Sequence, residues 1–192
     1  MIKKVLVPSQ IFTVANILSP AECANYIALS ENIGYTEAPI TTHRGFELRP
    51  EIRNNERVIL DDPERALDLW QRVSEYIPST IGKWRAIGLN ERFRFYRYDP
   101  GQRFALHHDG SYRRPNGEES LLTFMIYLNE GFEGGETRFL LPYYYDVNER
   151  DVSVVPETGM AVCFVHELVH EGTPVIQGRK YVLRSDVMYS AA

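Results

Sequence analysis

The chain of 192 residues suits one domain with one substantial core, and an apolar content of 44% excludes an intrinsically disordered protein. A net charge of −5 argues against a dedicated nucleic-acid-binding protein, which is usually basic. No apolar run reaches the roughly 18 residues of a membrane span, and the N-terminal residues lack the apolar region of a signal peptide. We therefore expect a soluble, cytoplasmic protein in which Cys23 and Cys163 are buried thiols.

The first predicted helix has a distinct N-terminal signal. Ser19 is followed directly by Pro20 and, three positions after the serine, by Glu22. Serine and glutamate at this spacing form a capping box, and proline is favoured at the first helical position. The pattern predicts a helix that begins after Ser19 and ends near Gly34.

A second helix is predicted where Asp62 precedes Pro63, and Pro78 ends it. Its apolar stripe is expected to consist of Leu67, Trp70 and Val73. Between the two helices, residues 41–55 are polar without a clear period, which predicts a long loop. Residues 1–90 are therefore expected to be a helix-rich lead-in within a single domain, residues 1–192.

From residue 92 the hydrophobic period changes to two, which is typical of β-strands. The segments that carry this signal, or a continuous apolar run, are 92–98, 120–129, 159–165 and 179–189. Within the second segment, Thr123 and Tyr127 point to the opposite side from Leu122 and Phe124. Many short strands separated by turn sequences predict a β-sandwich or barrel over residues 91–192, with the helices covering one sheet.

The sequence HHD at residues 107–109 holds the first candidate metal ligands. Residues two apart on a strand point to the same side, so His107 and Asp109 can face one ion while His108 points away. A His-x-Asp triplet alone often arises by chance. A third ligand must therefore come from another strand.

His166 and His170 remain as candidates, because His43 lies in the polar loop. The segment HELVH also matches the zinc-protease motif HExxH, in which both histidines lie in the middle of a long helix. Valines and an aromatic residue precede this segment, and Gly172 and Pro174 follow it closely. These neighbours favour a strand and argue against a protease.

Two histidines and one carboxylate on one face of a metal leave three coordination positions free, as in non-haem Fe(II) oxygenases. Structural zinc would instead need four ligands, commonly thiolates, and the cysteines lack the spacing for it. Lys180 and Arg184 lie on the same face of one predicted strand. A cation inside a barrel needs an anionic partner, which a dicarboxylate co-substrate supplies, and Tyr127 can donate its hydroxyl to the same carboxylate.

Three stretches of the chain resemble the catalytic domain of the prolyl 4-hydroxylase-like branch of the Fe(II)/2-oxoglutarate-dependent dioxygenases. They are YDPGQRFALHHDG, YLNEGFEGGETRF and HEGTPVIQGRKYVLRSDVMY. The resemblance covers residues 92–190, and residues 12–34 look like the helical lead-in of that branch. It implies a double-stranded β-helix, a jelly roll with the metal inside.

The resemblance also implies roles for individual residues. Those that match the iron ligands are His107, Asp109 and His170. Those that match contacts to 2-oxoglutarate are Lys180, Tyr127 and Tyr98. Arg184 departs from the small polar residue that some prolyl hydroxylases have at its position, but its inward direction makes it, with Thr123, a candidate for contact with substrate or co-substrate. The implied reaction is hydroxylation of a C–H bond with Fe(II), 2-oxoglutarate and O2, and ascorbate is left open as a further reductant.

The resemblance favours a prolyl residue in a peptide or protein as the substrate. A free amino acid or another small molecule is one alternative, and a jelly-roll module that binds a metal or ligand without turnover is another. Residues 42–55 and 110–120 are expected to form loops at the gate of the site, with the tyrosines of residues 143–145 at its rim. No nucleic-acid or membrane partner is expected.

Overall fold

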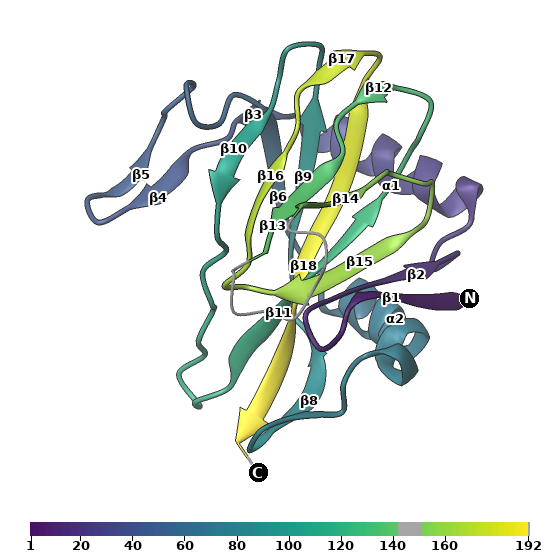
Figure 1. Cartoon of the computed structure of the whole chain (residues 1–192), viewed down its shortest axis with the longest axis vertical. Helices are drawn as coiled ribbons and strands as arrows, with labels where there is room; N and C mark the ends of the chain where they lie inside the picture. Colours follow the sequence, from purple (N-terminus) through teal and green to yellow (C-terminus); the bar gives the residue numbers. More distant parts are fainter. Residues whose placement is uncertain (142–150, 192) are drawn as a thin grey trace.

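The computed structural model describes residues 1–141 and 151–191, so the tyrosines at 143–145 lie outside the described residues. The fold is a jelly roll of two facing sheets, as expected, with two helices outside it (Figure 1). The large sheet contains, in order, β1 (Ile2–Val7), β2 (Ile11–Ala15), β15 (Ala161–Val165), β11 (Glu119–Tyr127), β18 (Lys180–Ala191), β9 (Arg92–Tyr98), β6 (Glu56–Asp61) and β3 (Thr36–Glu37). The strands β8 (Trp84–Leu89) and β7 (Thr80–Ile81) extend it beside β18.

The smaller sheet faces the large one. It contains β10 (Phe104–His107), β16 (Val169–Gly172), β13 (Thr137–Leu140) and β14 (Asp151–Val154). Two further antiparallel pairs complete the strands: β12 (Glu133–Gly134) with β17 (Val175–Gln177), and the hairpin of β4 (Ile40–Thr42) with β5 (Gly45–Glu47). The helices are α1 (Pro20–Ile33) and α2 (Pro63–Val73), and a 3-10 turn, Ser74–Tyr76, follows α2.

Two hydrophobic clusters lie on opposite faces of the large sheet. The first lies between the sheet and the helices and includes Leu69, Phe95, Phe124, Ile126 and Leu183. The second lies between the two sheets and includes Tyr96, Tyr98, Tyr127, Phe139 and Val182. The predicted alternation in β11 and β18 is therefore confirmed, and both helices cover one face of the large sheet (Figure 1).

The start of α1 forms as the capping signal predicts. The Ser19 hydroxyl accepts from the Glu22 backbone N–H at 3.3 Å, and the Glu22 carboxylate accepts from the Ser19 N–H at 2.8 Å. These reciprocal bonds satisfy two backbone donors that a helix start leaves free. The helix ends at Gly34, whose φ of 96° is accessible to glycine at little cost.

The apolar face of α2 differs from the prediction. Leu67 is 57% exposed, whereas Ala66, Leu69 and Val73 are buried. Trp70, which was predicted in the stripe, is partly buried against the same cluster. Spacing alone allows either leucine to define the helix face, and packing against the sheet selects Leu69.

The two leucines provide a direct test of this helix face. Replacing Leu69 with alanine is expected to lower the free energy of unfolding by about 2–5 kcal/mol, because it leaves a cavity in the core. The same change at Leu67 should alter stability by less than about 0.5 kcal/mol, since the side chain is mostly in water. Urea unfolding of both variants measures the difference, and equal losses would contradict this packing.

The prediction of a helix-rich lead-in over residues 1–90 is wrong. Besides the two helices, this part contains the β1–β2 hairpin, β3 and β6 of the large sheet, and β4–β5 within the predicted loop of residues 41–55. These strands are short, and those within the large sheet depend on distant partners: β2 pairs with β15 and β6 pairs with β9. Short-range periodicity therefore carries little of their signal. No helix in the described ranges is long and apolar enough to cross a membrane.

Candidate metal centre and co-substrate pocket

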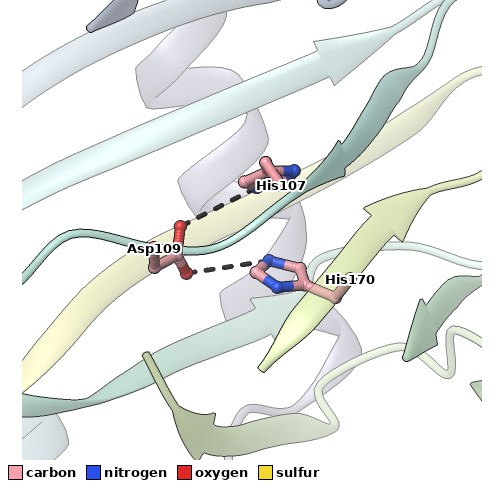
Figure 2. Close-up of side chains that lie close together, drawn as sticks. All are labelled: His107, Asp109 and His170. Atoms are coloured by element: carbon pink, nitrogen blue, oxygen red, sulfur yellow. Dashed lines mark ion pairs between the residues drawn. The ribbon is translucent and has the colours of Figure 1, made fainter. Parts of the chain in front are cut away.

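The three predicted ligands come together between the sheets. His107 of β10 lies directly opposite His170 of β16 in the antiparallel ladder. Asp109 follows the end of β10, where its backbone N–H donates to the carbonyl of His166 at 3.0 Å. One ligand atom from each of the three side chains lies within 4.8 Å of the other two, and Figure 2 shows the rings facing the carboxylate. All three side chains are largely buried.

Each imidazole is held in the orientation that a metal ligand needs. The Nδ1 atom of His107 lies 2.8 Å from the carbonyl oxygen of Ala105, and that of His170 lies 2.8 Å from the carbonyl of Leu168. A carbonyl only accepts, so Nδ1 must carry the proton and Nε2 keeps its lone pair. The two Nε2 atoms lie 3.8 and 3.7 Å from the oxygens of Asp109.

The electrostatics favour two neutral imidazoles and one carboxylate. Burial lowers the pKa of His107 to about 3, with a further contribution from His170. Burial also lowers the pKa of His170. Burial alone would raise the pKa of Asp109, but the Arg184 guanidinium and the two histidines outweigh it and hold this pKa well below its usual range. These are the protonation states in which the groups bind a metal.

The other histidines are placed elsewhere. His43 is exposed, as expected, and His108, which was expected to point away from the metal, is exposed too. His166 lies in a turn between β15 and β16, and His170 lies on β16, so the HELVH segment is not helical. This contradicts the zinc-protease interpretation, which needs both histidines on one helix face.

Asp109 is supported through both of its oxygens. The Nη1 atom of Arg184 lies 2.9 Å from Oδ1, and the hydroxyl of Thr123 donates to Oδ2 at 2.6 Å. Arg184 also pairs with Asp186 at 3.2 Å. Both residues were predicted to contact substrate or co-substrate, whereas the structure places them against the candidate ligand carboxylate. Their donors fix the orientation of this carboxylate.

A directed chain of hydrogen bonds continues behind Thr123. Because the Thr123 hydroxyl donates to Asp109, it must accept from Nδ1 of His166, which lies at 2.9 Å. Nε2 of His166 then accepts from the Ser120 hydroxyl at 3.0 Å, and that oxygen accepts from the Tyr112 backbone N–H at 2.8 Å. Sequence reasoning missed this role of His166 and Ser120, because only the register of β11 against β15 brings them together.

The Thr123 hydroxyl is the link of this hydrogen-bond chain to Asp109, and Thr123→Val removes it at nearly constant volume. The Fe(II) affinity is expected to fall about tenfold or more, because groups that hold a metal ligand commonly contribute this much. A competition titration against a coloured chelator under anaerobic conditions measures it. Thr137→Val is the matched control, since its hydroxyl contacts no candidate ligand, and it should retain wild-type iron affinity. Equal Fe(II) affinity of the wild type and Thr123→Val would show that this hydrogen-bond chain does not support iron binding.

Lys180 is a buried cation that lines the same pocket as the three candidate ligands. It is 3% exposed, and its Nζ donates to the Gly135 carbonyl at 2.5 Å. The Nζ atom lies 5.1 Å from the ring centroid of Tyr98 and 5.5 Å from that of Tyr127. Among the described residues no carboxylate forms an ion pair with it, and burial lowers its pKa to about 7 despite the opposing charge of Glu136. Such a cation is expected to bind an anionic ligand.

The wall around Lys180 explains two features of the sequence. Gly135 has a φ of 72°, and a Cβ there would lie 3.2 Å from Cδ of Lys180, so glycine suits this turn. The Tyr127 hydroxyl donates to Thr137 Oγ1 at 2.7 Å, and Thr137 lines the pocket. Tyr127 therefore reaches the pocket through a threonine that sequence reasoning missed.

One pocket joins the candidate ligands to Lys180. Besides the three ligands, its lining includes Tyr96, Tyr98, Phe104, Thr137, Lys180 and Arg184. Two imidazole nitrogens and a carboxylate suit Fe(II), and all three ligand residues line this pocket. A dicarboxylate that chelates the ion through one end can place its other carboxylate at Lys180. The residues present thus fit both an iron ion and 2-oxoglutarate.

Comparisons with known proteins agree with this geometry. Residues 93–185 match the model of the 2OG-Fe(II) oxygenase superfamily. Prolyl 4-hydroxylase 1 of Arabidopsis thaliana is 24% identical over 90% of this chain, and the chain spans 66% of that relative. The chain thus spans slightly less than two thirds of this relative's length.

Solved structures share the fold. A viral collagen prolyl hydroxylase from Paramecium bursaria Chlorella virus-1, in complex with 2OG, has a TM-score of 0.64 and 23% identity, covering 94% of this chain and 97% of that one. A Trichoplax adhaerens prolyl hydroxylase, in complex with a peptide fragment of the hypoxia inducible factor oxygen degradation domain, has a TM-score of 0.67 and 16% identity, covering 94% of this chain and 84% of that one. The shared fold, the sequence match over residues 93–185 and the His-Asp-His cluster agree with the resemblance of this chain to the 2OG-Fe(II) oxygenase superfamily.

Proposed function

We propose that the chain is an Fe(II)- and 2-oxoglutarate-dependent dioxygenase that hydroxylates a prolyl residue in a peptide or protein. The observation that supports this most is that one pocket holds both a His-Asp-His cluster and a buried cation, Lys180, which forms no ion pair with a carboxylate of the described residues. A metal-binding module alone has no need for such a cation. The names of the relatives, all prolyl 4-hydroxylases, favour the prolyl substrate.

The proposed iron ligands are His107, Asp109 and His170. With 2-oxoglutarate and O2, the bound iron supplies the oxidising power that places an oxygen atom into a substrate C–H bond. The two carbonyl contacts hold each Nε2 toward the ion, and Arg184 and Thr123 keep the carboxylate in place. The protein thus provides a fixed ligand geometry before the substrates bind.

Lys180 is proposed to bind the far carboxylate of 2-oxoglutarate through its ammonium group. Tyr98 lies against that ammonium, and the Tyr127–Thr137 pair forms the adjacent wall. Aromatic rings on this side exclude water, so the ion pair formed there is stronger than at a surface. The co-substrate would be held at both ends, and the orientation of the substrate then decides which C–H bond reacts.

The experiment that tests this function uses proline-containing peptides and free amino acids with Fe(II), 2-oxoglutarate and air. Mass spectrometry should find a product that has gained one oxygen atom, with succinate formed in equal amount. An oxygen atom gained by the peptides supports the proposal. An oxygen atom gained only by free amino acids would show that free amino acids, not peptides, are the substrate class. Protein that binds iron and 2-oxoglutarate but forms no succinate with any substrate would be a binding module instead.

A further inference from the structure

A row of arginines lies on the same face of the large sheet as the pocket. In the antiparallel register, Arg94 of β9 lies opposite Arg184 of β18, and Arg57 of β6 lies opposite Tyr96 of β9. Residues that oppose each other across a ladder put their side chains on one face. Tyr96 and Arg184 line the pocket, so this face continues outward from the pocket across β9 and β6.

Arg53 adds a further guanidinium beside the iron ligands. It is 6% exposed, and its Cζ lies 4.6 Å from the ring centroid of Tyr96 and 4.4 Å from that of Phe104. The Phe104 ring in turn stacks on His107, with 3.5 Å between centroids. Nε of Arg53 donates to Asn55, but its Nη2 is buried without a partner in the described part of the chain. A buried cation therefore lies one ring away from a candidate ligand.

We call Arg53, Arg57 and Arg94 the arginine face. Arg94 pairs with Asp186 at 3.2 Å, but this carboxylate is shared with Arg184. Arg53 and Arg57 form no ion pair with any carboxylate of the described residues. Burial lowers the pKa of Arg57, and the charges of Arg53 and Arg94 lower it further against an opposing effect of Tyr96.

The charges around this face do not balance. The four guanidiniums, those of the arginine face and of Arg184, meet only two carboxylates, Asp109 and Asp186, which leaves an excess of two positive charges. Iron and 2-oxoglutarate do not remove this excess, because the two charges of the dicarboxylate match those of the ion. Buried and half-buried cations without partners are costly, so this face suits an anion that the free protein does not supply.

The position of the arginine face points to the substrate as the source of that anion. The proposed site for the far end of 2-oxoglutarate, Lys180, lies opposite Tyr98 at one end of β9. Arg57 lies on β6, which pairs with the other edge of β9. It is therefore two strands away from β18, roughly 10 Å at the usual spacing of strands. Arg57 and the neighbouring Ile59 are partly or largely exposed, so this end of the face is open to a ligand from solution.

We infer that the arginine face binds a carboxylate of the substrate, so that the enzyme acts on prolyl peptides with acidic residues beside the proline. This inference rests on the proposed hydroxylase function and names its substrate class. A carboxylate can accept two parallel hydrogen bonds from a guanidinium, which gives orientation as well as affinity. The acidic residue would thus position the neighbouring proline against the metal centre.

Peptide binding tests the inference directly. The full chain, loaded anaerobically with Fe(II) and 2-oxoglutarate, is titrated against two fluorescein-labelled peptides that carry glutamate or glutamine on both sides of one proline. The glutamate peptide is expected to bind about tenfold more tightly at low salt, and this advantage should shrink as salt screens the charges. Equal affinities for the two peptides would overturn the inference.

Arg57→Gln is the variant of choice, because Arg57 is partly exposed and its loss breaks no ion pair. It should remove most of the preference for the glutamate peptide over the glutamine peptide. Arg65→Gln on α2 is the control for net charge, and it should keep the preference. A preference that survives Arg57→Gln to the same extent as Arg65→Gln would argue against this site.

Competitors identify the source of the carboxylate. Displacement of the labelled glutamate peptide by an unlabelled acidic peptide supports side-chain carboxylates, and displacement by free L-proline at similar concentration supports an α-carboxylate at the same site. Tighter binding of a single-stranded oligonucleotide of equal charge would overturn the inference in favour of phosphate. Equal turnover of glutamate and glutamine peptides would leave the hydroxylase function intact while removing the arginine face as its specificity site.

Discussion

His170→Ala is expected to abolish succinate formation. His170 supplies one of three candidate ligand atoms, and no other described histidine faces that position. Loss of groups that only support a ligand commonly lowers metal affinity or activity 10- to 100-fold, so loss of a ligand should exceed about a hundredfold. Succinate release per chain, with Fe(II) and 2-oxoglutarate in excess, measures the effect.

The adjacent histidine of the HHD sequence gives a control within the same site. His108 is exposed and is not part of the metal cluster of the described residues, so His108→Ala should keep wild-type succinate formation. Circular dichroism should show that both variants are folded. If His170→Ala kept full turnover, or if the two variants lost activity equally, the assignment of ligands would be wrong.

Lys180→Ala is expected to raise the KM for 2-oxoglutarate by about a hundredfold, with much less effect on Fe(II) binding. The change removes the only cation proposed to meet the far carboxylate, and breaking a buried charge pair costs about 2–5 kcal/mol. Steady-state kinetics and the iron titration separate the two effects. A variant that lost iron but kept its KM for 2-oxoglutarate would exclude the proposed role of Lys180.

The same lysine predicts a dependence of co-substrate binding on pH. Burial lowers the pKa of Lys180 to about 7 in the free protein, whereas a bound carboxylate would raise it. Below about pH 7 the ammonium form is present and the Kd should be constant. Above it, a proton must be taken up on binding, so the Kd should rise by up to about tenfold per pH unit. Lys180→Arg should remove this slope, because arginine remains charged.

The parts of the site that were predictable depend on short-range spacing. His107 and Asp109 are two residues apart, and Lys180 follows His170 by ten residues along one stretch that resembles the family. The capping box of α1 is equally local. In each case, neighbouring residues in the sequence determine the geometry.

The parts that were missed depend on long-range register. The His166 side chain reaches the Asp109 carboxylate through Thr123, which lies 43 residues away from His166 in the sequence. Arg53 has no local signal for burial, since the rings of Tyr96 and Phe104 that cover it belong to later strands. Likewise, the exposure of Leu67 follows from how α2 docks on the sheet. Pairing of distant strands decides these contacts, and periodicity within one segment does not encode it.

We propose that His107, Asp109 and His170 bind one ferrous ion while leaving room for 2-oxoglutarate to chelate it. Anaerobic titration of metal-free, folded protein with Fe(II) and 2-oxoglutarate tests it most directly. We predict a weak visible charge-transfer band that appears only when both are present, saturates at one iron per chain, and is absent from His170→Ala. A wild-type protein that shows no such band, or a His170→Ala variant that shows it undiminished, would contradict the claim.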